Sequence, residues 1–343
     1  MFEKISLCFD SNGCPNRCRH CWIGHKSNEI IEKEKIIEIV KGFTKYANRI
    51  EVYSWIREPD YSDNYKEQWE LDNELSVNSK PQRFELLSFY RLVRDKEYIN
   101  WLKKFDIKKY QLTLFGKEET TDYYVGRKGA YKEILEATNI LLNNGLLPRW
   151  QMFIYKNNLD EIDYILSLIE SMNLKERCLK NGGEFEFFIH TGSCDGENRN
   201  NYDQWIEKSD IKKIPKQYFI GNLIEEKILF ESLLENKETA KLNNNNPIFY
   251  IDNEFNVYPN FSDMSEHWKL GNLNIDSIEN IIQVYSENMS PAQYLRNNIP
   301  LSELVSISGD SKSNKLFTEN DYIDYLVNSY FINMYMNRKD KKI

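Results

Sequence analysis

Three of the six cysteines, Cys14, Cys18 and Cys21, lie within eight positions, in a segment that also contains the turn formers Gly13 and Pro15. Thiolates are the usual protein ligands of iron–sulfur clusters, and three of them on one loop can converge on one face of a cuboidal cluster. No fourth cysteine follows at a matching distance. A four-iron cluster bound here would therefore keep one iron open to a small ligand, and an open iron is a place for chemistry.

A structural zinc site is the alternative, formed by the three cysteines together with His20 or His25, because zinc takes four Cys or His ligands. Zinc knuckles usually contain two separated cysteine pairs, and this sequence has no second pair. A third interpretation is three buried cysteines without a metal, which the surrounding turn residues disfavour. The spacing favours the open cluster and leaves zinc as its rival.

The trio resembles the cluster motif of the radical S-adenosylmethionine (SAM) superfamily, in which the amino acid end of SAM binds the open iron. His20 departs from the motif, because many members have an aromatic residue before the last cysteine. The resemblance implies one 4Fe-4S cluster ligated by Cys14, Cys18 and Cys21. It also implies SAM and a reducing electron donor such as flavodoxin or ferredoxin. Reductive cleavage of SAM would give a 5′-deoxyadenosyl radical that abstracts a substrate hydrogen.

A second motif follows about 40 residues later, where Glu58-Pro59 ends an apolar strand and resembles the superfamily's Gly-Gly-Glu-Pro sequence. A carboxylate at Glu58 can accept strong hydrogen bonds from the amino group of SAM. Ile56 and Arg57 replace the usual glycines, so backbone approach to a ligand is less free. An ordinary surface carboxylate is the alternative.

Further candidate contacts to the cofactor come from two later strands. Thr113 and Gly116 resemble the superfamily's Ser-x-x-Gly, which implies that Thr113 contacts the methionine end of SAM. Gln151 and Tyr155 are candidate ribose or adenine contacts. Ordinary strand composition and interior packing are the alternatives for these residues.

The candidate catalytic residues, His190 and Cys194, lie in or beside a polar loop. We expect Cys194 to be exposed, and a thiol near a substrate radical can donate a hydrogen atom; an incidental thiol is the alternative. His190 can bind substrate or transfer a proton near neutral pH, or it can simply end a strand.

These residues fall at or just after the ends of predicted strands. The strands are expected at 5–9, 49–55, 84–90, 109–116, 149–155 and 184–190, alternating with helices at 29–46, 97–105, 130–144 and 159–173. The run 84–90 is ambiguous between strand and helix, and we interpret it as the third strand. Such alternation predicts an α/β fold with parallel strands and right-handed crossovers. Reactive groups gather at the carboxyl ends of barrel strands. We therefore expect a partial (β/α)6 barrel.

Beyond the barrel we expect a small α+β domain. The predicted divisions are a core barrel at 1–215, a small domain at 216–300 and a helical extension at 301–343. Two strands within 248–260 and the sequence Gly271-Asn272-Leu273 resemble the SPASM or Twitch auxiliary domain. Asn260 stands where a cysteine is common in those domains, and no cysteine follows Cys194. We expect no auxiliary cluster here and a domain that covers the substrate.

The composition of the chain disfavours some classes of partner. The 343 residues are 41% hydrophobic and 14% aromatic, which suits a globular core. A net charge of −8, without a basic block before the last few residues, disfavours nucleic acid as a partner. No signal peptide and no apolar run of about 20 residues occurs, so we expect a cytoplasmic protein without membrane contact. Clustered thiols also fit a reducing compartment.

The expected activity is hydrogen abstraction from a peptide or protein, since relatives with SPASM-like ends often modify peptides. A small metabolite is the rival substrate. A non-catalytic, zinc-stabilised binding protein is the alternative from a different class.

Overall fold

The alternating side chains of β1 (Phe2–Phe9) separate onto two faces of the strand. Ile5, Leu7 and Phe9 are fully buried and pack with the apolar side of α1 (Lys33–Phe43). This packing follows from the two periodicities, because every second strand residue and every third or fourth helix residue share a face. The computed structural model describes residues 1–241, 245–259 and 264–339.

The other elements follow in chain order. The strands are β2 (Ala47–Tyr53), β3 (Lys109–Leu114), β4 (Leu147–Phe153), β5 (Glu186–His190), β6 (Ile224–Glu225), β7 (Ile248–Ile251), β8 (Asn256–Pro259), β9 (Gly271–Asn272) and β10 (Leu316–Phe317). The helices are α2 (Tyr65–Leu75), α3 (Phe89–Leu92), α4 (Tyr98–Leu102), α5 (Glu118–Val125), α6 (Ala130–Asn143), α7 (Ile162–Ser171), α8 (Leu174–Lys180), α9 (Glu226–Leu233), α10 (Ile278–Ser286), α11 (Pro291–Asn298), α12 (Leu301–Ser308) and α13 (Glu319–Lys339).

One sheet has the order β2-β1-β7-β8-β9, and β1 is parallel to both of its neighbours. Leu7 consequently lies between Val52 of β2 and Phe249 of β7. The antiparallel pairing of β7 with β8 confirms the hairpin that the sequence predicts. This hairpin continues the sheet of the first strand. Asn260 lies outside the described residues, and the domain divisions at 215 and 300 stay a prediction.

A second sheet, β3-β4-β5, is parallel throughout. Its outer side packs against α6, α7 and α8 through a large apolar cluster that includes Trp150, Ile134 and Ile165. As predicted, α6 stops just before Gly145, whose φ of +77° suits glycine. The two sheets and their helices confirm the α/β class and a partial, open barrel.

The third predicted strand, at 84–90, is wrong. Residues 81–88 form an irregular segment that leads into the short helix α3. Ser88 caps this helix by accepting the backbone N–H of Arg91, which ends any extended conformation there. The segment still reaches the second sheet through one backbone hydrogen bond of 2.9 Å from Gln111 N to Glu85 O. Five of the six predicted parallel strands therefore form.

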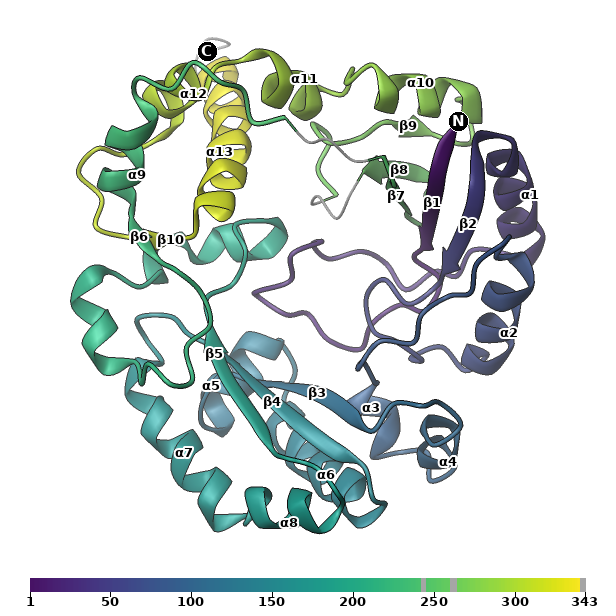
Figure 1. The fold of residues 1–343 in the computed structure, drawn as a ribbon, viewed down its shortest axis with the longest axis vertical. Coiled ribbons are helices and arrows are strands. Elements are labelled where there is room, and N and C mark those ends of the chain that lie inside the picture. Colours follow the sequence, from purple (N-terminus) through teal and green to yellow (C-terminus); the bar gives the residue numbers. More distant parts are fainter. Residues whose placement is uncertain (242–244, 260–263, 340–343) are drawn as a thin grey trace.

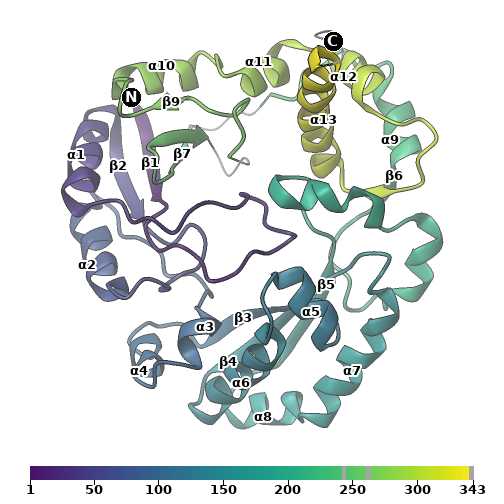
Figure 2. The same cartoon turned by 180° about the vertical axis from the view of Figure 1, so that it is seen from behind.

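Figures 1 and 2 show the two sheets on opposite sides of a ring of elements, with α9, α12 and α13 completing the ring. In both views the segment that follows β1 runs from the strand end across the middle of the molecule. The short antiparallel pair β6–β10 connects the second sheet to these helices. Within the described ranges no helix is both long and apolar enough to cross a membrane.

Candidate active site around the cysteine loop

The cysteine loop, defined here as residues 10–31, is held by backbone contacts from distant parts of the chain. Arg17 N donates to Val125 O at 3.1 Å, and Glu197 N donates to Cys21 O at 2.8 Å. Glycines allow these approaches. A Cβ at Gly126 would lie 2.1 Å from the carbonyl oxygen of Arg17, and Gly126 also has a φ of +69°. The end of α5 is thus shaped to receive this loop.

The three cysteines of this loop are unbridged and half-buried. Burial raises the pKa of the Cys14 thiol to about 12 and raises the pKa of Cys21. Burial also raises the pKa of Cys18, and the charges of Cys14 and Cys21 add to the effect. Without a metal these thiols stay protonated; a bound cluster would supply the positive charge that ionises them.

The histidines of the zinc alternative have the following contacts. The His20 ring lies 4.7 Å from the centroids of both Phe115 and Phe153, and His25 Nε2 lies 3.0 Å from Cys18 O. Over the described residues, no three His, Cys, Asp or Glu side chains are close enough together to bind a single metal ion. An iron–sulfur cluster spreads its thiolates around a larger body. Three unbridged cysteines on one loop are a donor set that an iron–sulfur cluster can use.

Glu58 is buried beside the first cysteine, as its Glu-Pro motif predicts. Its backbone N–H donates to Gly13 O at 3.3 Å, and its Oε1 accepts the Ser88 hydroxyl at 2.8 Å. Burial raises the pKa of Glu58 to about 8, while the Ser88 hydrogen bond and the nearby Arg127 charge oppose that rise. No cationic side chain is hydrogen-bonded to this carboxylate among the described residues. A carboxylate here is a group that can bind an ammonium ion, so the role predicted for Glu58 stays a prediction.

Arg127 is a candidate that the sequence analysis missed. Its Nε donates to Asn16 Oδ1 at 2.8 Å and its Nη2 to Glu133 Oε2 at 2.6 Å. The same guanidinium lowers the pKa of both Cys18 and Glu58, and its bond to Asn16 joins it to the cysteine loop. A single arginine in the turn between Gly126 and Gly129 was the available signal. Ser88 lies in the segment that was wrongly predicted as a strand, and no sequence signal marked it as a site residue.

Thr113, Gln151 and His190 meet on one face of the second sheet. Gln151 Nε2 donates to Thr113 Oγ1 at 2.6 Å, and Gln151 Oε1 lies 3.2 Å from His190 Nε2. Burial lowers the pKa of His190 to about 4, so the ring is neutral at physiological pH. A neutral ring can donate one hydrogen bond and accept another. The structure thus joins three separately predicted residues into one polar row.

Tyr155 is almost fully buried and stacks on Tyr124 at 4.6 Å between ring centroids. Its hydroxyl donates to Asn198 Oδ1. Burial is the main cause that raises the pKa of Tyr155, and the charges of Tyr124 and Cys18 raise it further. The ring is therefore near the cysteine loop but packed within protein. The predicted contact of Tyr155 with a ribose or adenine stays a prediction.

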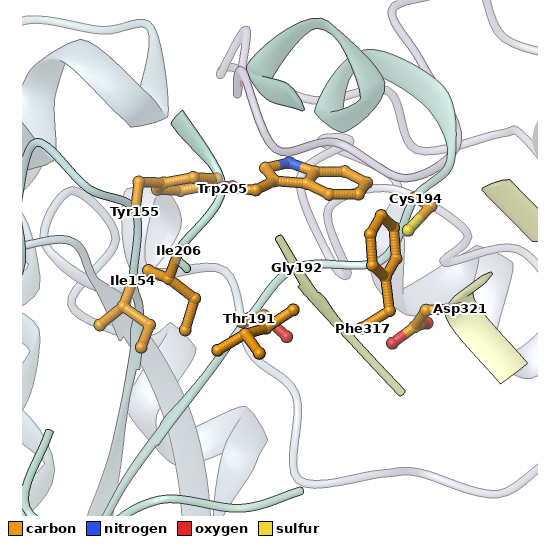
Figure 3. A pocket seen from close by; sticks show the side chains of 10 residues that line it. Ile154, Tyr155, Thr191, Gly192, Cys194, Trp205, Ile206, Phe317 and Asp321 are labelled. Carbon is orange, nitrogen blue, oxygen red and sulfur yellow. The ribbon is translucent and has the colours of Figure 1, made fainter. Parts of the chain in front are cut away.

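Cys194 was expected to be exposed, and this is wrong, because only 2% of the residue is accessible. The polar residues around it are turned toward other partners: Asp195, for example, accepts the Asn328 side chain at 3.0 Å. Figure 3 shows Cys194, Phe317 and Asp321 at one end of a narrow pocket, with Tyr155 at the other and Trp205 spanning it. The thiol thus lies inside this pocket, away from the surface.

Residues 9–169 match the family model of the radical SAM superfamily, and this stretch contains the cysteine loop, Glu58, Thr113 and Gln151. This stretch of the chain is therefore a radical SAM domain. The resemblance of the cysteine motif to the radical SAM superfamily is thereby confirmed, and this family implies an iron–sulfur cluster and SAM. The resemblance of the later segment to a SPASM or Twitch domain stays a prediction. No curated protein matches the chain.

Solved structures share the fold. The structure of native anSMEcpe with bound AdoMet and Kp18Cys peptide is 14% identical with a TM-score of 0.52, over 98% of this chain and 99% of that chain. Native anSMEcpe with bound AdoMet is 14% identical at a TM-score of 0.50, with the same shares covered. SuiB from Streptococcus suis bound to precursor peptide SuiA is 10% identical at 0.48, over 88% and 66%.

Proposed function

We propose that this enzyme reductively cleaves SAM at one 4Fe-4S cluster and abstracts a hydrogen atom from a peptide or protein. The observation that carries the proposal is the convergence of three half-buried thiols with a buried carboxylate and a guanidinium. Cys14, Cys18 and Cys21 would hold the cluster. When bound and reduced, the cluster supplies the electron that cleaves SAM.

Glu58 and Arg127 match the two charges of an amino acid. Both residues are hydrogen-bonded to the cysteine loop, Glu58 through Gly13 and Arg127 through Asn16. The Glu58 carboxylate can pair with the ammonium group while the Arg127 guanidinium pairs with the carboxylate. Binding of the ammonium would favour the ionised form of Glu58, against the effect of its burial. These residues thereby orient the amino acid end of SAM toward the loop.

The polar row of Thr113, Gln151 and His190 would contact the rest of the cofactor or the substrate. Two hydrogen bonds, one through each end of the Gln151 amide, fix the orientation of this side chain. Cys194 is a candidate hydrogen-atom donor. A thiol can donate a hydrogen atom only while protonated, and burial with nearby Asp321 keeps its pKa high. Tyr155 lines the same pocket as Cys194.

A peptide substrate is supported by the shared fold with a solved structure that contains a bound peptide, over nearly the whole of both chains. A small metabolite is the rival. We propose the cytoplasm as the compartment, since the six cysteines are unbridged. We also propose flavodoxin or ferredoxin as the electron donor, because the cluster needs a strong one-electron reductant.

The test is anaerobic purification, reconstitution with iron and sulfide, and measurement of 5′-deoxyadenosine after adding dithionite and SAM. The proposal expects iron near four per chain and 5′-deoxyadenosine that depends on dithionite. Zinc without iron and without SAM cleavage would refute it. Peptide-derived material in the purified protein favours the peptide substrate over a metabolite.

A further inference from the structure

Three charged residues follow the carboxyl ends of three adjacent parallel strands. Asp10 follows β1, Arg57 lies just past β2, and Asp252 follows β7. Because these strands are neighbours, their carboxyl ends form one edge of the sheet, and the cysteine loop leaves from that edge. Asp10 and Asp252 have no exposed side-chain surface, and the Arg57 side chain is 4% exposed. Such buried charges need partners.

Arg57 contacts both Asp10 and the returning arm of the cysteine loop. Its Nε donates to Asp10 Oδ1 at 2.8 Å, and its two terminal nitrogens donate to Ser27 O at 2.6 Å and Lys26 O at 3.1 Å. A planar guanidinium can satisfy a carboxylate and several carbonyls at once, which a lysine cannot do. Arg57 therefore fixes the loop to the end of β1.

The contacts of Arg57 extend to Cys14 through Asn28. Arg57 Nη1 donates to Asn28 Oδ1 at 3.2 Å, and the Asn28 side chain is bonded to both backbone groups of Cys14. Cys14 N donates to Asn28 Oδ1 at 3.1 Å, and Asn28 Nδ2 donates to Cys14 O at 3.0 Å. Gly13 leaves room for this approach, because a Cβ there would lie 3.0 Å from Asn28.

The hairpin β7–β8 holds the same arm from its other side. Lys26 Nζ lies 3.2 Å from Asp252 Oδ2, and the side chain of Asn253 donates to the Ser27 hydroxyl. Asp252 is itself fixed, since its Oδ1 accepts the backbone N–H groups of Glu254 and Asn256. A contact with residues over 220 positions away thus reaches the loop that holds the thiols.

We propose that Asp10, Arg57, Lys26 and Asp252 form an ionic brace whose role is to position the cysteine loop for cluster binding. This inference rests on the proposed function only for the cluster itself, since the brace is a property of the protein without metal. Arg57 and Asp252 are positioning residues, and the hairpin holds the cluster loop in addition to any role in covering substrate.

The test compares variants that disrupt the ionic brace with one that leaves it intact. Arg57→Met alone would leave Asp10 buried without a partner, because the other oxygen of Asp10 has no hydrogen bond. The double variant Arg57→Met with Asp10→Asn avoids that charge, and Asp252→Asn breaks the contact with Lys26. The control is Arg49→Met, which removes an exposed ion pair between Arg49 of β2 and Glu3 of β1.

Two measurements follow, hydrogen exchange in metal-free protein and the rate of iron loss to a chelator after reconstitution. We expect exchange over residues 12–28 to become about tenfold faster in both brace variants, and iron loss to accelerate with it, while Arg49→Met matches wild type. Unchanged exchange in that segment, or a uniform increase over the whole chain, would overturn the brace. If wild-type protein binds no iron, the proposed function fails, and exchange still decides the inference.

Discussion

The Ser88 hydroxyl donates to Glu58 Oε1 at 2.8 Å while it accepts the backbone N–H of Arg91 at 3.1 Å. Because the second contact uses the oxygen as an acceptor, the hydroxyl proton points to the carboxylate. Ser88 is fully buried, so water does not compete for either bond. The loop that replaces the third barrel strand thus supplies the group that orients Glu58.

We predict that Ser88→Ala weakens SAM binding about tenfold, since a hydrogen bond to a charged group contributes about 1.5–3 kcal/mol. Calorimetric titration of reconstituted protein with SAM measures the change, and Ser88→Thr should retain most of the affinity. Ser290→Ala is the matched control, because Ser290 also caps a helix in a buried position. An equal loss of affinity in both variants would show that only the helix cap matters.

Each of Cys14→Ala, Cys18→Ala and Cys21→Ala should abolish dithionite-dependent formation of 5′-deoxyadenosine and lower the bound iron. A cluster held by two thiolates has lost one of its three fixed irons. Cys178→Ala is the control, since Cys178 is a buried cysteine of α8 in the apolar cluster under the second sheet. Iron content equal to wild type in a loop variant would contradict the assignment of that cysteine.

Gly126→Ala should displace the cysteine loop, because the new methyl group would overlap the Arg17 carbonyl. Gly145→Ala provides the comparison: its φ is also positive at +77°, but no atom lies within 4 Å of the added Cβ. The backbone strain of about 1–2 kcal/mol is common to both variants. We expect iron uptake to fall only in Gly126→Ala, and equal uptake would show that the loop adjusts.

We predict that the buried carboxyl group of Asp72 makes the stability of the protein depend on pH. Burial raises the pKa of Asp72 to about 8, although two hydrogen bonds from Ser54 oppose the rise. Between about pH 4 and pH 8 the unfolded chain has lost this proton and the folded chain keeps it, so the free energy of unfolding falls as pH rises. Asp72→Asn removes that loss.

Denaturant unfolding at pH 4.5 and pH 8 measures the difference. The advantage of Asp72→Asn over wild type should grow with pH by about 1.4 kcal/mol for each unit by which the pKa is raised. Asp63→Asn is the control, because the Asp63 carboxylate is fully exposed. A constant difference between Asp72→Asn and wild type across this range would contradict the protonated state.

Local sequence signals identified most of the barrel. Alternation in β1 and β2 and the helical spacing in α6 and α7 are short-range properties, and all four elements lie where they were expected. The segment 84–90 misled because Phe84, Leu86 and Leu87 are apolar without a clear period, and the cap at Ser88 settles its conformation.

Long-range pairing could not be predicted. Nothing in Ile248–Ile251 indicates that it pairs with β1, since parallel pairing leaves no local trace, and Arg57 gave no sign that it would reach Asn28. The predicted exposure of Cys194 failed for a related reason. Its polar neighbours suggested a surface loop, yet several of them are bonded inward.

The pairing of β1 with β7 also affects when the first sheet can form during synthesis of the chain. The first strand leaves the ribosome at once, but its second neighbour is not synthesised until residue 251 of 343. At about 5–20 residues per second, β1 keeps an open edge for on the order of ten to fifty seconds. During that interval the loop with the three thiols lacks its anchor at Asp252. We therefore expect a cluster to be inserted only after residue 252 has been synthesised, and we expect a nascent fragment ending near residue 215 to expose an unpaired strand edge that chaperones would need to protect.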